Sequence, residues 1–177
     1  MSFQTASGVY VGLGSNMGDR LGYLKQALAD MDAHARCEVV RCSPVYETAP
    51  VGYVDQPSFL NMAAMLRTDL PPMDLLHMLM AIERKHGRVR DERWGPRTLD
   101  LDILHWSGVT LTTDELTIPH PRMAERPFVL IPLLDIADHD PSLNTWLRKR
   151  METMDDEGGV ELWTHMHWPG ASVHSAN

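Results

Sequence analysis

Cysteine, basic charge and long apolar runs are all scarce in this chain of 177 residues. The two cysteines, Cys37 and Cys42, lie in one predicted strand, where their odd spacing directs the side chains to opposite faces. We therefore expect no disulfide, as in a protein of the reducing cytoplasm. No apolar run approaches the ~20 residues that cross a bilayer, and the start of the chain (MSFQTASGVY) is unlike a signal peptide. A cytoplasmic protein without a membrane partner is expected.

Basic residues are outnumbered, because 16 Lys and Arg stand against 24 Asp and Glu, for a net charge of −8. This balance argues against nucleic acid as a partner and against an anionic membrane surface. The usual nucleotide-binding loops are also missing. No Walker A sequence occurs, and the G-x-G-x-x-G pattern fails at Met17. The sequence GSNMGD instead predicts a tight turn in which Ser15, Asn16 and Asp19 cap the following helix.

The composition is that of one compact domain, with 44% hydrophobic and 23% charged residues. We assign residues 1–150 to a single domain. The stretch 151–177 is rich in Gly, Ser and His and lacks strong periodicity, which predicts a loosely held tail.

Periodicity predicts the order β-α-β-β-α-β, followed by an apolar segment at 128–137 that docks as a helix or an extended element. The predicted strands are 8–14, 38–47 (with Pro44 marking an edge or a bulge), 58–67 and 98–105, and the helices begin near Asp19 and Pro71. This order is typical of the α+β class. It predicts a ferredoxin-like plait, a mainly antiparallel sheet with helices packed on one side of it.

The strand at 58–67 has two distinct faces. Leu60 and Met62 point to one face, while Phe59 and Asn61 point to the other. An aromatic plate beside an amide suits a flat heterocycle with a mixed hydrogen-bonding edge. The alternative is an ordinary half-exposed strand with one aromatic residue. Phe128 is a candidate for a second ring facing Phe59.

A pair of carboxylates marks the strand at 98–105. Leu101 and Ile103 alternate with Asp100 and Asp102, so both carboxylates share the face opposite the core. Two like charges at this spacing repel each other, and Asp is disfavoured in strands. Mg²⁺ would relieve the repulsion, since it binds to one or two carboxylates together with substrate phosphates. The alternative is a solvated strand face.

Arginine is concentrated just before that strand. Residues 84–97 hold six of the sixteen basic residues: Arg84, Lys85, Arg88, Arg90, Arg93 and Arg97. Favourable charge at a helix C-terminus explains the first two, but the other four lie beyond Gly87. Because the arginine fork matches phosphate oxygens, this loop predicts a polyphosphate site. Arginines beside paired carboxylates are typical of metal-assisted phosphoryl chemistry.

One histidine, His120, is a further candidate for a phosphate contact. His120 lies between two prolines in IPHP, which hold it in a rigid loop. It contacts phosphate or is simply an exposed loop residue. His165 and His167 form an H-x-H without nearby partners, so a metal site there is not favoured.

The run RVRDERWGPRTLDLDIL, with TAPVG and DQPSFLN before it and IPHPRMAERPFVLIPL after it, resembles the 6-hydroxymethyl-7,8-dihydropterin pyrophosphokinases of folate biosynthesis. The resemblance spans about residues 8–140. It implies a ferredoxin-like fold and transfer of the β,γ-diphosphate of ATP to the hydroxymethyl group of the dihydropterin, with release of AMP.

The resemblance also implies roles for individual residues. The catalytic and metal-binding groups, with two Mg²⁺ ions expected, are Arg88, Arg97, Asp100 and Asp102. The groups expected to bind the pterin are Thr48, Val51, Phe59, Asn61, Trp94 and Phe128. The groups expected to bind ATP are Glu83, Arg88, Arg90, Arg97, Thr117, His120 and Arg126.

Two other readings remain open at this point. A metal-dependent kinase or hydrolase acting on another flat heterocycle would share the aspartates and arginines but release ADP or phosphate. An RNA-binding module is the second, because ferredoxin-like sheets also bind RNA through exposed aromatics. The charge of −8 counts against it. We expect a monomer whose partners are ATP and the dihydropterin.

Overall fold

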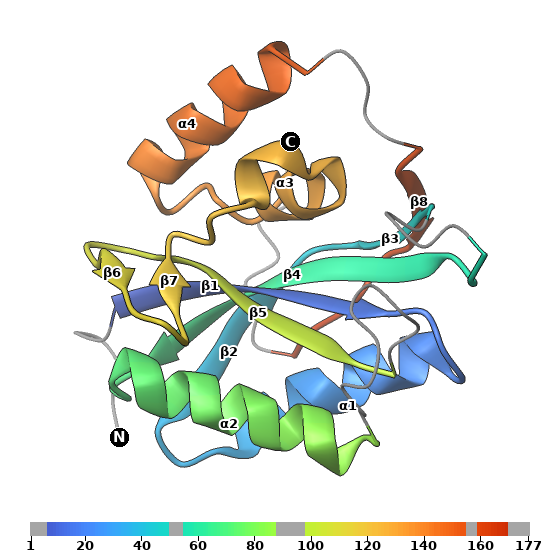
Figure 1. Ribbon diagram of the computed structural model, residues 1–177, viewed down its shortest axis with the longest axis horizontal. Coiled ribbons are helices and arrows are strands. Elements are labelled where there is room, and N and C mark those ends of the chain that lie inside the picture. The colour runs from blue at the N-terminus through green and yellow to red at the C-terminus, as the bar shows by residue number, and fades with distance from the viewer. Residues whose placement is uncertain (1–6, 50–54, 88–97, 155–158, 170–177) are drawn as a thin grey trace.

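An antiparallel sheet with helices on both faces forms the centre of the protein (Figure 1). The computed structural model describes residues 7–49, 55–87, 98–154 and 159–169. The elements are, in chain order, β1 (Ser7–Ser15), α1 (Arg20–Ala33), β2 (Cys37–Cys42), β3 (Val45–Thr48), β4 (Phe59–Thr68), α2 (Pro72–Lys85), β5 (Asp100–Trp106), β6 (Leu111–Thr112), β7 (Thr117–Ile118), α3 (Pro127–Leu134), α4 (Pro141–Glu152) and β8 (Glu161–Thr164).

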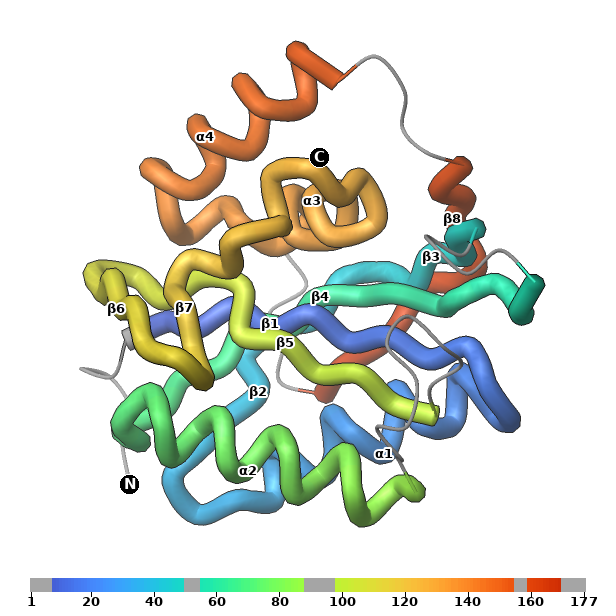
Figure 2. The backbone as a smooth tube through the Cα atoms, viewed as in Figure 1, coloured from blue at the N-terminus to red at the C-terminus, as the bar shows by residue number. Residues whose placement is uncertain are grey.

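The sheet has the strand order β5-β1-β4-β3-β8, and β2 pairs with β4 next to β3. All of these pairings are antiparallel. The path of the chain places β1 between β4 and β5, although β4 and β5 are remote from it in sequence (Figure 2). The two short strands β6 and β7 form a separate hairpin. The predicted α+β fold with a mainly antiparallel sheet is confirmed.

Helices α1 and α2 cover one face of the sheet (Figure 1). Leu24 and Leu28 of α1 and Leu75 of α2 are fully buried in one apolar cluster with residues of β1, β4 and β5, as the helical spacing predicts. Leu60 and Met62 of β4 belong to the same cluster. Each such side chain contributes about 1.5–3 kcal/mol of burial free energy.

Helices α3 and α4 cover the opposite face, so the prediction of helices on one side only is wrong (Figure 1). The reason is the composition of α3, since the segment PFVLIPLL contains no polar residue. A helix of this kind needs an apolar surface on more than one side. Tyr10, Ala63 and Leu104 of the sheet supply one surface, and Leu143 of α4 supplies another.

The predicted strand at 38–47 is in fact two strands, β2 and β3, which both pair with β4. The break lies at Ser43 and Pro44, where proline has no N–H to contribute to a ladder. A register shift also occurs between Val39 and Arg41. Consequently Cys37 and Cys42 both contact the α1–α2 core, whereas opposite faces were expected. Both thiols are free, as predicted.

The turn after β1 caps α1 in part as predicted. Asp19 is the N-cap, because its Oδ1 accepts a hydrogen bond from Gly22 N at 3.0 Å. Asn16 does something else: its Nδ2 donates to Gln56 Oε1 and to Pro57 O. Ser15 Oγ is buried and has no hydrogen-bond partner among the described residues. Asn16 therefore ties the β1–α1 turn to the segment leading into β4.

The C-terminal stretch contributes to the sheet, unlike the loose tail that was expected. β8 pairs with β3, and the indole N–H of Trp168 donates to Val39 O at 3.0 Å. The edge of β3 offers unpaired backbone groups, which β8 satisfies. That residues 1–150 carry the catalytic domain stays a prediction. Within the described ranges, no helix has both the length and the apolar character needed to cross a bilayer.

Candidate active site

Strand β5 places two carboxylates on the face of the sheet that α3 covers. Leu101 and Ile103 are buried in the core on the α1–α2 side, and Asp100 and Asp102 alternate with them. Both aspartates are partly buried. This is the arrangement that the alternation in the sequence predicts.

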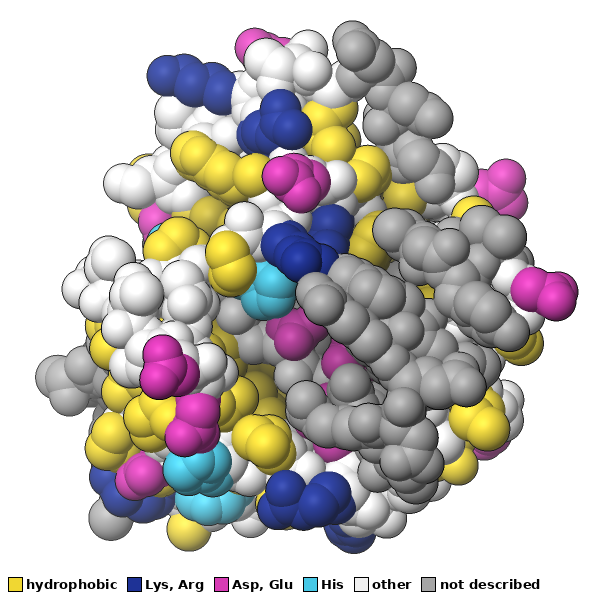
Figure 3. Space-filling view, in the orientation of Figure 1, with side chains coloured by type: hydrophobic (Ala, Val, Ile, Leu, Met, Phe, Trp, Pro, Cys, Tyr) yellow, Lys and Arg dark blue, Asp and Glu magenta, His cyan; other side chains and the backbone are white. Residues whose placement is uncertain are grey.

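A depression in this face, which we name the central hollow, lies between the sheet and the start of α3. Its lining residues come from β1, β4, β5 and the segment around α3: Gly12, Leu13, Gly14, Asn61, Met62, Asp100, Asp102, Leu104, Arg126, Phe128 and Val129. Basic, histidine and acidic side chains gather at the centre of this side of the molecule, below α3 (Figure 3). The fold thus brings together five predicted site residues from three separate parts of the sequence: Asn61, Asp100, Asp102, Arg126 and Phe128.

Two glycines form the floor of the central hollow. Gly12 pairs with Asp102, and Gly14 pairs with both Asp100 and Asn61. Neighbouring side chains use the space that the two glycines leave. A methyl group on Gly12 would lie 3.3 Å from Leu104 Cδ1, and one on Gly14 would lie 2.8 Å from Asn61 Oδ1. The sequence predicts Gly14 only as the end of the strand at 8–14 and the start of the turn that follows. A further signal was missed, because small residues on one face of a central strand let a ligand or a neighbouring side chain approach the backbone.

The amide of Asn61 is held from the side of β3. Its Nδ2 donates to Thr48 Oγ1 at 2.7 Å, and Thr48 is only 3% exposed. Phe59 is a neighbour of this pair, since Thr48 is its register partner. A methyl group on Gly14 would lie 3.7 Å from Phe59 Cδ1. Phe59 therefore borders the central hollow on the side of Asn61.

A second depression, the hairpin hollow, lies between β5, α2 and the β6–β7 hairpin. It is lined by Leu76, Leu101, Asp102, Ile103, Asp114, Glu115, Leu116, Thr117, His120 and Pro121. Two of the residues expected to bind ATP, Thr117 and His120, meet here. Asp102 borders both hollows, so it lies at the boundary between them.

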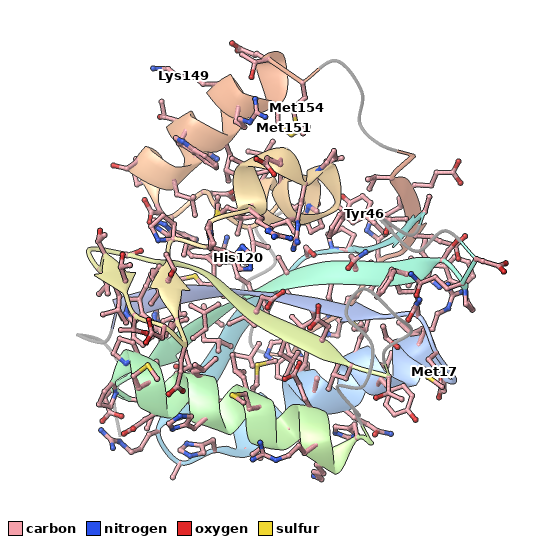
Figure 4. All side chains as sticks on the ribbon, in the orientation of Figure 1. Met17, Tyr46, His120, Lys149, Met151 and Met154 are labelled. Atoms are coloured by element: carbon pink, nitrogen blue, oxygen red, sulfur yellow. The ribbon has the colours of Figure 1, made fainter. Side chains whose placement is uncertain are left out.

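His120 lies between α3 and the sheet (Figure 4). Its backbone N–H donates to Leu104 O at 2.8 Å, and its Nδ1 accepts from Arg122 N. Burial lowers the pKa of the imidazole below its usual value. The nearby Arg126 lowers the pKa further, and Asp100 opposes this effect. A neutral ring at physiological pH is the consequence.

Glu83 is a buried carboxylate at the base of β5, with only 2% of its surface exposed. Its Oε2 accepts a hydrogen bond from Leu101 N at 3.1 Å. Leu101 is the residue between Asp100 and Asp102, so this contact anchors the backbone that carries both carboxylates. No pattern in the sequence predicts this anchoring contact.

Five predicted site residues lie outside the described residues: Val51, Arg88, Arg90, Trp94 and Arg97. Their roles stay predictions. Two basic residues of the same sequence cluster, Arg84 and Lys85, occupy the last turn of α2. This position agrees with the interpretation of both residues as favourable charges at a helix C-terminus. In addition, Lys85 Nζ lies 2.8 Å from Asp30 Oδ1.

The donor set fits a hard divalent cation. In the described part of the chain, no three His, Cys, Asp or Glu side chains cluster as a complete metal cage. Mg²⁺ does not need one, because it keeps several waters and takes its other ligands from one or two carboxylates and from substrate phosphates. Asp100 and Asp102 supply such a pair beside a hollow open to a ligand.

The fold and the site together define an α+β protein whose groups suit metal-assisted phosphoryl transfer to a flat heterocycle. A family model gives this class a more specific identity. Residues 10–138 match the family described as 7,8-dihydro-6-hydroxymethylpterin-pyrophosphokinase (HPPK). The chain belongs to this family and is a pyrophosphokinase of folate biosynthesis, which confirms the resemblance found in the sequence.

Two curated relatives are similar to this chain over most of their own length. The 2-amino-4-hydroxy-6-hydroxymethyldihydropteridine pyrophosphokinase of Bacillus subtilis is 45% identical over 166 residues, which cover 94% of this chain and 96% of that protein. The enzyme of the same name from Pseudomonas aeruginosa is 48% identical over 129 residues, or 73% of this chain and 80% of that protein.

Solved structures agree on the fold. An HPPK-DHPS crystallised with substrates has a TM-score of 0.62 at 14% identity, covering 84% of this chain and 43% of that one. A Plasmodium falciparum HPPK-DHPS with pterin and p-hydrobenzoate has a TM-score of 0.61 at 14% identity, covering 89% of this chain and 48% of that one. This chain thus spans less than half of the length of those two proteins.

Proposed function

We propose that this pyrophosphokinase transfers the β,γ-diphosphate of ATP to 6-hydroxymethyl-7,8-dihydropterin, and that the two hollows bind the two substrates. The observation that carries the proposal is the position of Asp102, which borders both hollows. A reaction between two bound molecules needs the reacting groups side by side. A carboxylate shared by both depressions lies where such groups would meet.

The central hollow is the proposed pterin site. Phe59 and Phe128 would stack on the two faces of the ring, while Asn61 and the backbone of Thr48 and Val51 would read its edge. The described part of the site supports this, because Asn61 and Phe128 line one depression and Phe59 borders it. Aromatic side chains that border a flat depression suit a planar heterocycle.

The hairpin hollow is the proposed nucleoside site. Thr117 would contact the ribose and His120 a phosphate, with Leu76 and Ile103 providing apolar wall. Arg88, Arg90, Arg97 and Arg126 would bind the phosphates, since arginine forms forked hydrogen bonds with phosphate oxygens. Glu83 would border this site from beneath β5.

Asp100 and Asp102 would hold Mg²⁺, and two ions are expected. When bound, the metal neutralises phosphate charge and orients the transferred group. The chain's own groups would align the partners. The hydroxymethyl oxygen attacks the β-phosphorus and its proton passes to water. The bond between that phosphorus and the oxygen bridging to the α-phosphate breaks, and AMP leaves with that oxygen. Positioning and charge neutralisation account for such chemistry without a protein nucleophile.

A cytoplasmic monomer without a nucleic-acid partner completes the proposal. The expectation that nucleic acid is not a partner is supported by the net charge of −8 and by the helices that, in the described part of the chain, cover both faces of the sheet.

Phosphorus NMR of the protein with ATP, Mg²⁺ and 6-hydroxymethyl-7,8-dihydropterin tests the reaction. We expect AMP and a pterin diphosphate to appear together, and only when all three components are present. ADP as the product would establish a simple kinase instead. Absence of turnover by folded protein, checked by circular dichroism, would refute the proposal.

A further inference from the structure

The side chain of Asn61 is constrained on two sides, by a hydroxyl on β3 and by a glycine on β1. We propose that Thr48 and Gly14 are positioning residues that preset the Asn61 amide for the ring bound in the central hollow. The inference rests on the proposed function, because it assumes that the central hollow binds the pterin.

Thr48 provides the first constraint. Its buried hydroxyl accepts a hydrogen bond from Asn61 Nδ2 at 2.7 Å. The Asn61 side chain is only partly buried and borders the hollow, so without this bond its terminal torsion would be free to sample a broad range. An amide has two N–H donors and a carbonyl acceptor. One N–H is used by Thr48, which leaves the other N–H and Oδ1 for a ligand.

Gly14 provides the second constraint, through the space that it leaves. A methyl group at this position would lie 2.8 Å from Asn61 Oδ1, which is closer than van der Waals contact allows. The backbone does not require glycine here, because Gly14 is not among the glycines with positive φ. Backbone atoms are also not in the way, since Leu60 O would be 3.8 Å from the methyl carbon. Alanine would therefore fit the strand and displace the amide.

The two constraints act on opposite ends of one amide. The Thr48 hydroxyl contacts Nδ2, and the Gly14 backbone faces Oδ1. A preset amide reduces the entropy that a ligand must overcome on binding. Loss of either constraint should therefore weaken pterin binding and leave nucleotide binding unchanged.

Thr48→Val and Gly14→Ala test the inference. Val keeps the shape of Thr and removes the hydroxyl, while Thr48→Ser keeps a hydroxyl and should restore binding. Calorimetry would measure 6-hydroxymethylpterin binding to each protein loaded with Mg²⁺ and α,β-methylene-ATP, whose bridging carbon blocks transfer. We expect Thr48→Val and Gly14→Ala each to weaken pterin affinity about 10-fold, which is the effect of leaving one hydrogen bond unmade. The affinity for the nucleotide analogue should not change.

Gly8→Ala is the matched control. It makes the same change in the same strand. Its methyl group would meet the flexible end of Met65 at 2.9 Å and would lie 3.7 Å from Ser107 Oγ, an ordinary van der Waals contact. Gly8 does not line the central hollow. Pterin affinity should equal that of the wild type.

The Asn61→Ala background separates positioning from direct contact. If Thr48 and Gly14 act through the amide, neither substitution should weaken pterin binding further once the amide is gone. Equal losses in both backgrounds would overturn the inference, and so would unchanged affinity in the single variants. Wild-type turnover in the NMR assay is the separate readout for the proposed function. If the wild type fails to bind the pterin at all, both proposals fail.

Discussion

Asn61 and Asp100 lie on either side of Gly14, because β4 and β5 both pair with β1 and Gly14 is the register partner of each. Neighbouring strands are ~4.8 Å apart, so roughly 10 Å separates the two flanking backbones. A flat ring that contacts Asn61 can therefore direct a short substituent toward Asp100 across the glycine. The sheet register thus places the Asn61 amide, the proposed ring-recognition group, beside the carboxylate pair.

The first prediction concerns the carboxylate pair. Asp100→Asn and Asp102→Asn keep the size of each side chain but remove a charge that would hold Mg²⁺. We expect turnover to fall by at least about 10²-fold in each variant, comparable to the loss of one transition-state-stabilising group. Steady-state formation of AMP at saturating substrates is the measurement. Glu38→Gln, an exposed carboxylate on β2, is the control and should retain full activity. Near-normal rates in both aspartate variants would rule out the metal assignment.

The second prediction concerns the two aromatic rings at the central hollow. Phe59→Ala and Phe128→Ala should each weaken pterin binding, because a stacking contact contributes roughly 1–3 kcal/mol. Nucleotide affinity should change little in Phe59→Ala, since Phe59 adjoins Asn61 and not the hairpin hollow. Calorimetry with bound nucleotide analogue measures both quantities. The exposed Trp146 on α4 offers a control, Trp146→Ala. Unchanged pterin affinity in both phenylalanine variants would contradict the proposed stacking.

Much of the fold follows from local patterns in the sequence. Strict alternation predicts which face carries Asp100 and Asp102, and helical spacing predicts the buried stripes of α1 and α2. These predictions succeed because each depends on a single helix or strand and on the repeat of its side-chain directions.

The failures depend on contacts between remote segments. The covering of the second sheet face by α3 depends on Tyr10 and Leu104 from other strands, and the pairing of β8 with β3 joins residues more than a hundred positions apart. Cys42 faces the core because of a register shift that no periodicity reveals. The same applies to the site: the sequence identifies Asn61 and Asp100 separately, but only the register places Gly14 between them.

The third prediction concerns pH and stability. Burial alone would raise the pKa of Asp140, but hydrogen bonds from Leu143 N, Ser107 and His105 outweigh it and lower the pKa below the usual value for aspartate. A carboxyl group whose pKa is lower in the folded state stabilises the fold above its unfolded pKa, near 3.9. This stabilisation is lost as the pH falls through the folded value.

Asp140→Asn removes this ionisation and leaves an amide that still caps α4. Urea unfolding should show a less stable variant at pH 7, and the difference from the wild type should shrink as the pH falls below about 4. The control is Asp138, a carboxylate with 69% of its side chain exposed. Asp138→Asn should change the free energy of unfolding little at either pH. A deficit in Asp140→Asn that stays constant down to acid pH would contradict the assignment.

The last prediction separates two roles of Glu83, anchoring of β5 and contact with ATP. Glu83→Ala leaves Leu101 N without this acceptor in a buried position, which costs about 1–3 kcal/mol of unfolding free energy. Turnover should fall as well, because Leu101 lies between the two aspartates. Glu83→Gln keeps an oxygen that can accept from Leu101 N and removes only the charge.

The comparison of the two variants assigns the role. If anchoring dominates, Glu83→Gln should approach wild-type stability and turnover, whereas Glu83→Ala loses both. If the charge acts on ATP, the KM for ATP should rise in Glu83→Gln while the free energy of unfolding stays near that of the wild type. Wild-type stability in Glu83→Ala would show that the hydrogen bond to Leu101 does not hold β5. We expect the first pattern, since the carboxylate is almost fully buried beneath the strand that carries Asp100 and Asp102.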